Sequence, residues 1–289
     1  SGKGRLLKCT SCGKGTKVDE WVCEKCLEET KILTLKLLRI LQSDFGFMEE
    51  NLFINFSGSK GYHIHVRQKD IFSLPKSARV EFMDYLTLHE FDAPLQGFVF
   101  DGKQYHCPRF ARAKGNVQRL LAEILRLIES GSETDWMLLS TENPRTLKSW
   151  LQNREQLFKE FHAGTLPALP GKKTEPFWNN VIASLVEKQR LPIDRQTSGD
   201  IFKLVRVPDT LHGSTGLLAK SLTSTQLRDF LPLRDAAVFP PEVKRKVFVT
   251  HAPTVSIGKE TLDAVEQKEV ELSSPLAAYL VGWGAARLA

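Results

Sequence analysis

The sequence predicts a fold of the α/β (α+β) class. Apolar residues recur at helical spacing in several segments, among them 24–45 and 117–128. Two short runs with a strand pattern, 52–56 and 62–66, flank a turn that is rich in glycine. The 289 residues, of which 42% are hydrophobic, can bury a substantial core, and their number predicts one large domain or two smaller ones.

The charge balance is mildly basic. A formal net charge of +6 and a sequence pI near 9.0 favour a polyanionic partner, although a solvated basic surface is the more common cause. No apolar run is long enough to cross a bilayer, and residues 1–5 lack the apolar core of a signal peptide. We therefore expect an intracellular protein with no membrane contact. Because the chain has no initiator Met, we also expect a fragment or a processed chain.

Four cysteines near the N-terminus have the spacing of a metal site. Cys9, Cys12, Cys23 and Cys26 form C-x2-C-x10-C-x2-C, so each pair can place two thiolates on one tetrahedral ion. Two disulfides are the alternative, which is disfavoured where intracellular thiols stay reduced. We predict a structural Zn²⁺ site, because four thiolates leave no open position for a substrate. Cys107 stands apart and is predicted to be a small buried or half-buried residue.

The glycine turn begins the stretch 57–66, which reads Ser-Gly-Ser-Lys-Gly-Tyr-His-Ile-His-Val. Gly58 and Gly61 permit tight or left-handed backbone and the close approach of a ligand. Ser57, Ser59 and Lys60 offer hydroxyl donors and a positive charge, so the turn is predicted to bind phosphate. An ordinary glycine loop before a half-buried strand is the alternative, and the ten residues alone favour it.

Side chains alternate along the strand that follows the turn. Tyr62, Ile64 and Val66 are expected to point to one face, and His63 and His65 to the other. We expect this pattern to hide the apolar residues and to present the two imidazoles beside the turn.

Further helices are predicted for 79–88, 117–128, 146–161 and around 178–185, with short strands and turns between 91 and 114. Segment 108–114 is basic and contains one phenylalanine. It is predicted either to touch a nucleic-acid backbone or to be a solvated loop. A short terminal helix is predicted for 276–281.

A second group of polar residues lies between 191 and 217. Asp194 or Asp200, a predicted helix with Lys203 and Arg206, and His212 in a turn would supply a metal ligand, phosphate charges and a hydrogen-bond donor. The alternative is structural: either aspartate merely caps the next helix, and the histidine is a turn residue. The residues alone do not separate these interpretations.

Together these motifs resemble the small catalytic subunit of archaeal and eukaryotic DNA primase. Ser57-Gly58-Ser59-Lys60-Gly61-Tyr62-His63 is similar to the family motif Ser-Gly-x-x-Gly-x-His. The cysteine knuckle and Asp44-Phe45-Gly46-Phe47 precede it in the family's order, and 204–208 and 211–216 follow it. The resemblance implies the archaeo-eukaryotic primase core, with a mixed sheet, a zinc knuckle and a helical insert. It divides the chain into 1–114 (knuckle and first part of the core), 115–190 (helical insert and connecting loop) and 191–289 (second part of the core).

The resemblance also implies an activity: template-directed nucleotidyl transfer that makes short primers on single-stranded DNA, with Mg²⁺ or Mn²⁺ in a two-metal mechanism. It implies NTP or dNTP as substrate, the primase large subunit as partner, and a cytoplasmic location in an archaeon or a nuclear one in a eukaryote. Asp194 is the implied metal ligand. The implied nucleotide contacts are Ser57, Gly58, Lys60, Gly61, His63, Arg206 and His212.

One departure from the family pattern concerns the metal site. The family places an Asp-x-Asp pair on a strand shortly before the zinc cysteines, and the eight residues before Cys9 contain no aspartate. We expect an N-terminally incomplete sequence of an active subunit, so that this chain alone is incomplete for catalysis. The alternative is a non-catalytic, zinc-containing nucleic-acid-binding subunit with a primase-like fold.

Overall fold

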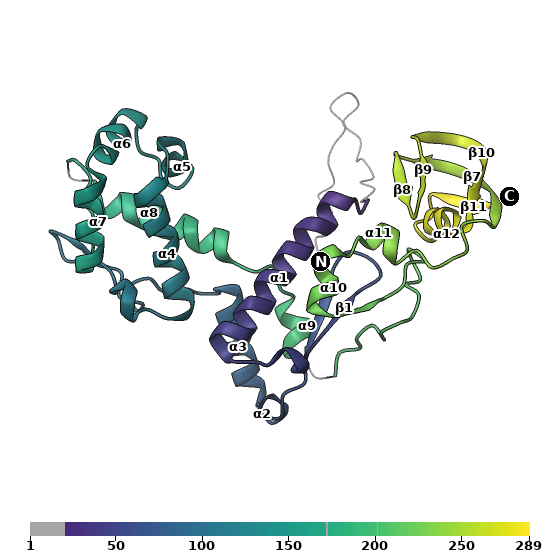
Figure 1. Ribbon diagram of the computed structural model, residues 1–289, viewed down its shortest axis with the longest axis horizontal. Helices are drawn as coiled ribbons and strands as arrows, with labels where there is room; N and C mark the ends of the chain where they lie inside the picture. Colours follow the sequence, from purple (N-terminus) through teal and green to yellow (C-terminus); the bar gives the residue numbers. More distant parts are fainter. Residues whose placement is uncertain (1–20, 172, 201) are drawn as a thin grey trace, which may run out of the picture. The chain divides into compact units, whose positions relative to one another are not determined.

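The computed structural model describes residues 21–171, 173–200 and 202–289, which form two compact units (Figure 1). The first unit contains 21–35, Glu49–Arg67 and Val205–Ala289, and the second contains Lys36–Met48 and Gln68–Leu204. The chain therefore leaves the first unit and returns to it twice. For this reason the two units do not coincide with the three segments that the resemblance implied.

In the first unit, β1 (Leu52–Phe56), β2 (Tyr62–Val66) and β6 (Ser221–Leu222) form an antiparallel sheet in the order β2-β1-β6. The short helix η1 (Glu49–Asn51) precedes β1. The register places Phe56 opposite Tyr62, so the glycine turn closes a hairpin between β1 and β2. The helix predicted for 24–45 and both predicted strands are confirmed. The alternating burial predicted for β2 is not observed, because all five of its residues are half-buried.

The rest of the first unit is a small β-rich body that the sequence did not reveal. After α10 (Ser224–Asp229) and α11 (Pro232–Asp235) the chain forms β7 (Lys244–Ala252), β10 (Val265–Ser273) and β11 (Ala286–Leu288), in the order β10-β7-β11, and the hairpin β8 (Val255–Ile257) and β9 (Glu260–Leu262). The predicted terminal helix is confirmed as α12 (Ser274–Gly282), which lies beside β7 and β11 (Figure 1). Its Leu276 and Leu280 are buried, as are Val247 and Val249 of β7.

The second unit is mainly helical. It contains α2 (Lys69–Phe72), α3 (Lys76–Thr87), α4 (Gly115–Ser130), α5 (Glu133–Met137), α6 (Pro144–Leu151), α7 (Arg154–Ala163), α8 (Thr174–Gln189) and α9 (Arg195–Gly199). A small antiparallel sheet joins β3 (Val99–Phe100), β4 (Tyr105–His106) and β5 (Thr165–Leu166), and η2 (Phe110–Arg112) precedes α4. The helical pattern predicted over 146–161 is interrupted at 152–153, where α6 ends and α7 begins.

Tryptophans and a phenylalanine fill the core of the second unit. Trp136, Trp150, Phe177 and Trp178 are buried, and their rings contact one another with centroids 5.1 to 6.2 Å apart. Two of the indole groups also donate to backbone carbonyls. Trp178 Nε1 donates to Pro167 O at 2.8 Å, and Trp150 Nε1 donates to Ala168 O at 3.0 Å. The third indole nitrogen, Trp136 Nε1, is buried and has no hydrogen-bond partner among the described residues. Within the described part of the chain, every helix is too short or too polar to span a bilayer.

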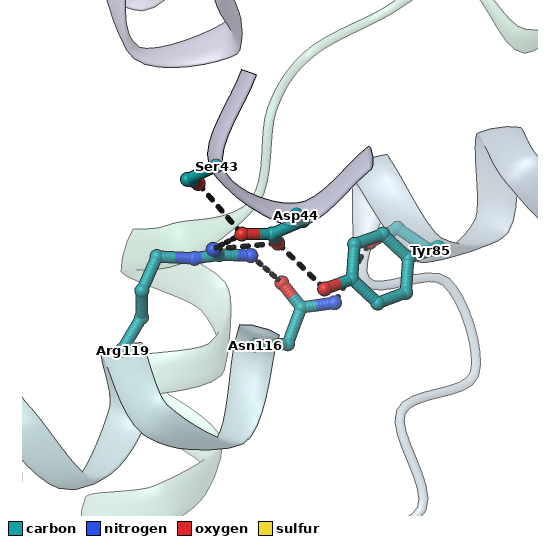
Figure 2. Close-up of polar contacts among 5 residues, drawn as sticks. All are labelled: Ser43, Asp44, Tyr85, Asn116 and Arg119. Atoms are coloured by element: carbon teal, nitrogen blue, oxygen red, sulfur yellow. Dashed lines mark hydrogen bonds and ion pairs between the residues drawn. The ribbon is translucent and has the colours of Figure 1, made fainter. Parts of the chain in front are cut away.

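A polar network joins three helices of this unit (Figure 2). Asp44, near the end of α1 (Glu24–Phe45), accepts two hydrogen bonds from Arg119 Nη1 of α4 at 2.9 and 2.7 Å. Tyr85 of α3 donates its hydroxyl to the same carboxylate at 2.6 Å, and Ser43 does so at 2.7 Å. Asn116 donates to the carbonyl of Tyr85 at 3.0 Å and accepts from Arg119. Burial alone would raise the pKa of Asp44, but these hydrogen bonds outweigh it and hold that pKa below its usual value.

Removal of this carboxylate is expected to destabilise the second unit. Asp44→Ala leaves Arg119 Nη1 and the Tyr85 hydroxyl without their acceptor, so we expect the free energy of unfolding to fall by about 3 kcal/mol. Urea denaturation followed by circular dichroism measures the loss. Glu123→Ala is the matched control, because it breaks an exposed ion pair with Arg126 on the same helix and should cost less than about 1 kcal/mol. Equal losses in the two variants would contradict the assignment.

Candidate functional site

The glycine turn is shaped by the side chain of its first residue. Ser57 N donates to Gly61 O at 2.8 Å, and the Ser57 hydroxyl oxygen accepts from the amides of Gly61 and Ser59 at 3.2 and 3.3 Å. A hydroxyl can accept two hydrogen bonds and donate one. Ser57 therefore uses its acceptor capacity to close the turn and keeps its O–H proton for another partner.

Gly58 is the residue on which a second segment of the chain packs. Its φ is +81°, and a Cβ added there would lie 2.7 Å from His212 Cβ and 3.1 Å from Leu217 O. Only glycine allows both this backbone conformation and this approach. The Thr215 hydroxyl, which is buried, donates to Gly58 O and accepts from Leu217 N at 3.2 Å.

The second segment is a compact loop that fixes His212. His212 N donates to Leu217 O at 2.8 Å, and its carbonyl accepts from Thr215 N at 3.2 Å and Gly216 N at 2.8 Å. On the far side of the loop, a Cβ added at Gly282 of α12 would lie 2.8 Å from Ser214 O. The loop is thus packed between the glycine turn and α12.

Three imidazoles and an arginine belong to this site. The rings of His63 and His65 lie edge to face with centroids 6.3 Å apart. His63 Nδ1 and His65 Nε2 are buried, and neither finds a hydrogen-bond partner among the residues that the structure describes. Burial lowers the pKa of His63, and the neighbouring His65 and Arg206 lower it further. Burial and then Arg206 lower the pKa of His212, and burial followed by Arg67 lowers that of His65.

These pKa shifts indicate the class of ligand that the site can bind. Each ring favours its neutral form because it is desolvated and has cations, not carboxylates, as its electrostatic neighbours. A bound anion would offset the effect of the neighbouring cations and so raise the pKa of each ring. It would also supply acceptors to His63 Nδ1 and His65 Nε2, which are buried without partners among the described residues. The site is therefore suited to a polyanionic ligand such as a chain of phosphates.

Arg206 reaches the site from a segment that is not helical. The prediction of a helix with Lys203 and Arg206 is wrong: residues 202–210 form turns and irregular backbone, and both side chains are exposed. The physical reason lies in the local sequence. Val205 and Val207 are β-branched and favour extended backbone, and Pro208 disfavours helical geometry at the residue before it.

Asp194 belongs to the second unit, where its position is defined by α9. It directly precedes that helix, its carbonyl accepts from Ser198 N at 3.1 Å, and its side chain is exposed. The next residue, Arg195, forms an ion pair with Asp84 of α3, which fixes the start of α9. Asp200 instead closes a turn, because its carboxylate accepts from Phe202 N at 3.0 Å.

Half of the predicted zinc knuckle lies within the described residues. Cys23 Sγ and Cys26 Sγ are 3.2 Å apart at the start of α1, and Cys26 N donates to Cys23 Sγ at 3.4 Å. This amide, followed by the neighbouring thiol, lowers the pKa of Cys23. Two unbridged thiols side by side fit one edge of a tetrahedral metal site. Cys9 and Cys12 lie outside the described residues.

The prediction for Cys107 is confirmed. The residue is buried, and burial raises the pKa of its thiol to about 12. It is therefore an unreactive part of the core of the second unit.

The structure places the glycine turn, His63, Arg206 and His212 in one unit. It adds Thr215, which the sequence analysis did not single out. A threonine between Ser214 and Gly216 carries no distinctive local signal. Its role is visible only once the loop packs on Gly58, 157 positions away in the sequence.

Comparison with known proteins assigns the chain to a family. The family model described as DNA primase small subunit matches residues 16–224. The DNA primase small subunit PriS of Methanothrix thermoacetophila is 31% identical over 284 residues, which cover 91% of this chain and 71% of the relative. PriS of Methanococcoides burtonii is 29% identical, with 90% and 70% covered, and PriS of Methanocaldococcus jannaschii is 31% identical, with 75% and 53% covered.

The fold, the site and these matches define a nucleotidyltransferase of the primase class. Within that class, the chain belongs to the DNA primase small subunit family.

The close packing at Gly58 can be tested against the other glycine of the turn. Gly58→Ala should lower the free energy of unfolding by about 2 kcal/mol or more, because it combines an unfavourable φ with contacts below van der Waals distance. Gly61→Ala should cost less than about 1 kcal/mol, since an added Cβ would meet only Thr30 Cγ2 at 3.7 Å. Thermal and urea unfolding of the two variants provide the measurement. A Gly58→Ala variant as stable as Gly61→Ala would contradict the described contact with His212.

Proposed function

We propose that this chain binds the triphosphate of an incoming NTP or dNTP at the glycine turn and transfers the nucleotide to a primer end on single-stranded DNA. The observation that carries the proposal is the packing of Gly58 against the His212 loop. That contact holds the Ser57 hydroxyl, His63 and His212 on one rigid frame. Family membership supports the reaction type.

In this proposal the residues of the site have distinct roles. Ser57 donates its hydroxyl proton to a phosphate oxygen, and Lys60 and Arg206 supply positive charge. His63 and His212 supply hydrogen bonds and become more basic as the phosphates approach. The primer 3′-oxygen attacks the α-phosphate, a new P–O bond forms, and the bond to the leaving pyrophosphate breaks. Tight anchoring of the β- and γ-phosphates would align this displacement.

Divalent cations, Mg²⁺ or Mn²⁺, would neutralise the charge that develops on the attacking and leaving oxygens. Among the described residues, no three carboxylate, imidazole or thiol groups lie together in an arrangement that could hold a metal ion. Asp194 is exposed and stands at a helix boundary fixed by Arg195 and Asp84. We therefore assign Asp194 as one ligand of the divalent cations. One carboxylate alone does not form a two-cation centre.

We infer a structural zinc ion for the cysteine knuckle. Cys23 and Cys26 would hold one edge of its coordination shell, and Cys9 and Cys12 would complete it. Metal analysis of the purified protein should find one zinc per chain, and mutation of Cys23 and Cys26 to Ser should remove it. A metal-free wild-type protein with four reactive thiols would contradict the assignment.

The proposed partners are the primase large subunit and a single-stranded DNA template. Both are supported by membership in a family of small subunits. The archaeal origin of the relatives supports a cytoplasmic location.

Substitutions separate the proposed metal ligand from the phosphate contacts. Asp194→Asn should abolish primer synthesis by the complex with the large subunit, whereas Asp200→Asn should retain it because Asp200 serves a turn. His63→Ala and Arg206→Ala should each weaken nucleotide binding roughly tenfold or more, as expected for lost charge-assisted hydrogen bonds. Incorporation of labelled nucleotide and the fluorescence of a bound ATP analogue are the two measurements. Activity retained in Asp194→Asn and lost in Asp200→Asn would reverse the aspartate assignment, and unchanged affinity would remove His63 or Arg206 from the site.

A further inference from the structure

A second concentration of positive charge lies in the helical unit. Residues 102–122 contain no aspartate or glutamate and five lysines or arginines. Arg109, Arg112 and Lys114 surround the short helix η2, and all three side chains are exposed. We call residues 109–114 the basic turn.

The three cations of the basic turn have no counter-charge among the described residues. None of Arg109, Arg112 and Lys114 forms an ion pair or a side-chain hydrogen bond with any residue in the described ranges. By contrast, exposed Arg126 pairs with Glu123 at 2.7 Å, and exposed Lys159 pairs with Glu155 at 2.6 Å. A group of like charges without counter-charges raises the local potential, which is unfavourable unless an anion is bound.

The basic turn is also held in place from both ends. Phe110, between two of the cations, packs against the hydrophobic core of the second unit. Arg109 O accepts hydrogen bonds from the amides of Arg112 at 2.9 Å and Ala113 at 3.1 Å, which closes the turn. Just beyond Lys114, the first turn of α4 is fixed by the network of Asp44, Tyr85, Asn116 and Arg119 (Figure 2). The cations are therefore carried by a preorganised backbone.

We propose that the basic turn binds the sugar-phosphate backbone of single-stranded DNA, as part of the path of the template. Three cations spread over six residues suit successive phosphates better than a single one. Two of them are arginines, whose planar guanidinium groups match phosphate oxygens. Contacts of this kind position a strand and carry no sequence preference, as a template requires. The identification of the bound strand as the template rests on the proposed function, whereas the inference that the basic turn binds nucleic acid does not.

The test is the salt dependence of DNA binding. In Arg109→Gln/Arg112→Gln/Lys114→Gln, the Kd for a fluorescent single-stranded oligonucleotide should rise about tenfold or more at moderate salt. The slope of log K against log salt should become shallower by about 2, since each lost phosphate contact contributes roughly 0.7 for single strands. The control is Arg126→Gln/Lys159→Gln/Arg190→Gln, which removes the same charge from exposed side chains that already have glutamate partners. It should leave the slope unchanged.

The outcomes separate this proposal from the proposed nucleotide site. Binding of a fluorescent ATP analogue to the basic-turn variant should equal that of the wild type, and its unfolding temperature should be unchanged. If the analogue binds nowhere near the glycine turn but the DNA slope still falls, the basic turn stands and the nucleotide site fails. An unchanged slope, or an equal fall in the control, would overturn the basic turn as a DNA site. Unchanged DNA binding with loss of large-subunit binding would assign it to a protein partner instead.

Discussion

The contact between Gly58 and the His212 loop is the constraint on which the first unit depends. Gly58 has a left-handed φ. Because it has no Cβ, His212 Cβ can pack directly against its backbone. The buried Thr215 hydroxyl ties the loop to the Gly58 carbonyl, and the close approach of Gly282 brings α12 against the other side of the loop. The glycine turn, the His212 loop and α12, which are far apart in the sequence, are therefore held in close contact. This geometry places His63 of the hairpin and His212 of the loop on one frame without a bound ligand.

The electrostatics of the chain follow from where its cations find partners. At the glycine turn, burial and neighbouring cations lower the pKa values of three imidazoles. A bound anion would raise these pKa values and favour the protonated rings. At the basic turn, three exposed cations have no carboxylate partner among the described residues. Asp44 and Arg119, by contrast, form an ion pair that stabilises the fold. A net charge of +6 is thus a poor guide to function, while the distribution of unpaired cations is a better one.

The sequence predicted those features that short-range physics determines. The bounds of α1 (Glu24–Phe45) and of the β1–β2 hairpin agree with the helical spacing of leucines and the glycine turn. The helix predicted through Lys203 and Arg206 failed because β-branched residues and Pro208 favour extended backbone there. The β7–β10 sheet was missed because β10 (Val265–Ser273) is rich in charged residues and depends on partners distant in sequence. Thr215 was missed for the same kind of reason, since its contact with Gly58 exists only after folding. Asp194, the proposed metal ligand, could be chosen over Asp200 only through a family resemblance.

The glycine turn and the His212 loop are proposed to bind the phosphates of a nucleotide. The most direct measurement is the NMR titration of His63 and His212, with and without a saturating nucleoside triphosphate. In the free protein both imidazole pKa values should lie below the usual value of about 6.5, because the rings are desolvated and near Arg206. The bound phosphates should raise both pKa values, because an adjacent anion stabilises the protonated ring. If both pKa values stay the same while the nucleotide is demonstrably bound, its phosphates lie elsewhere and the account of this site is wrong.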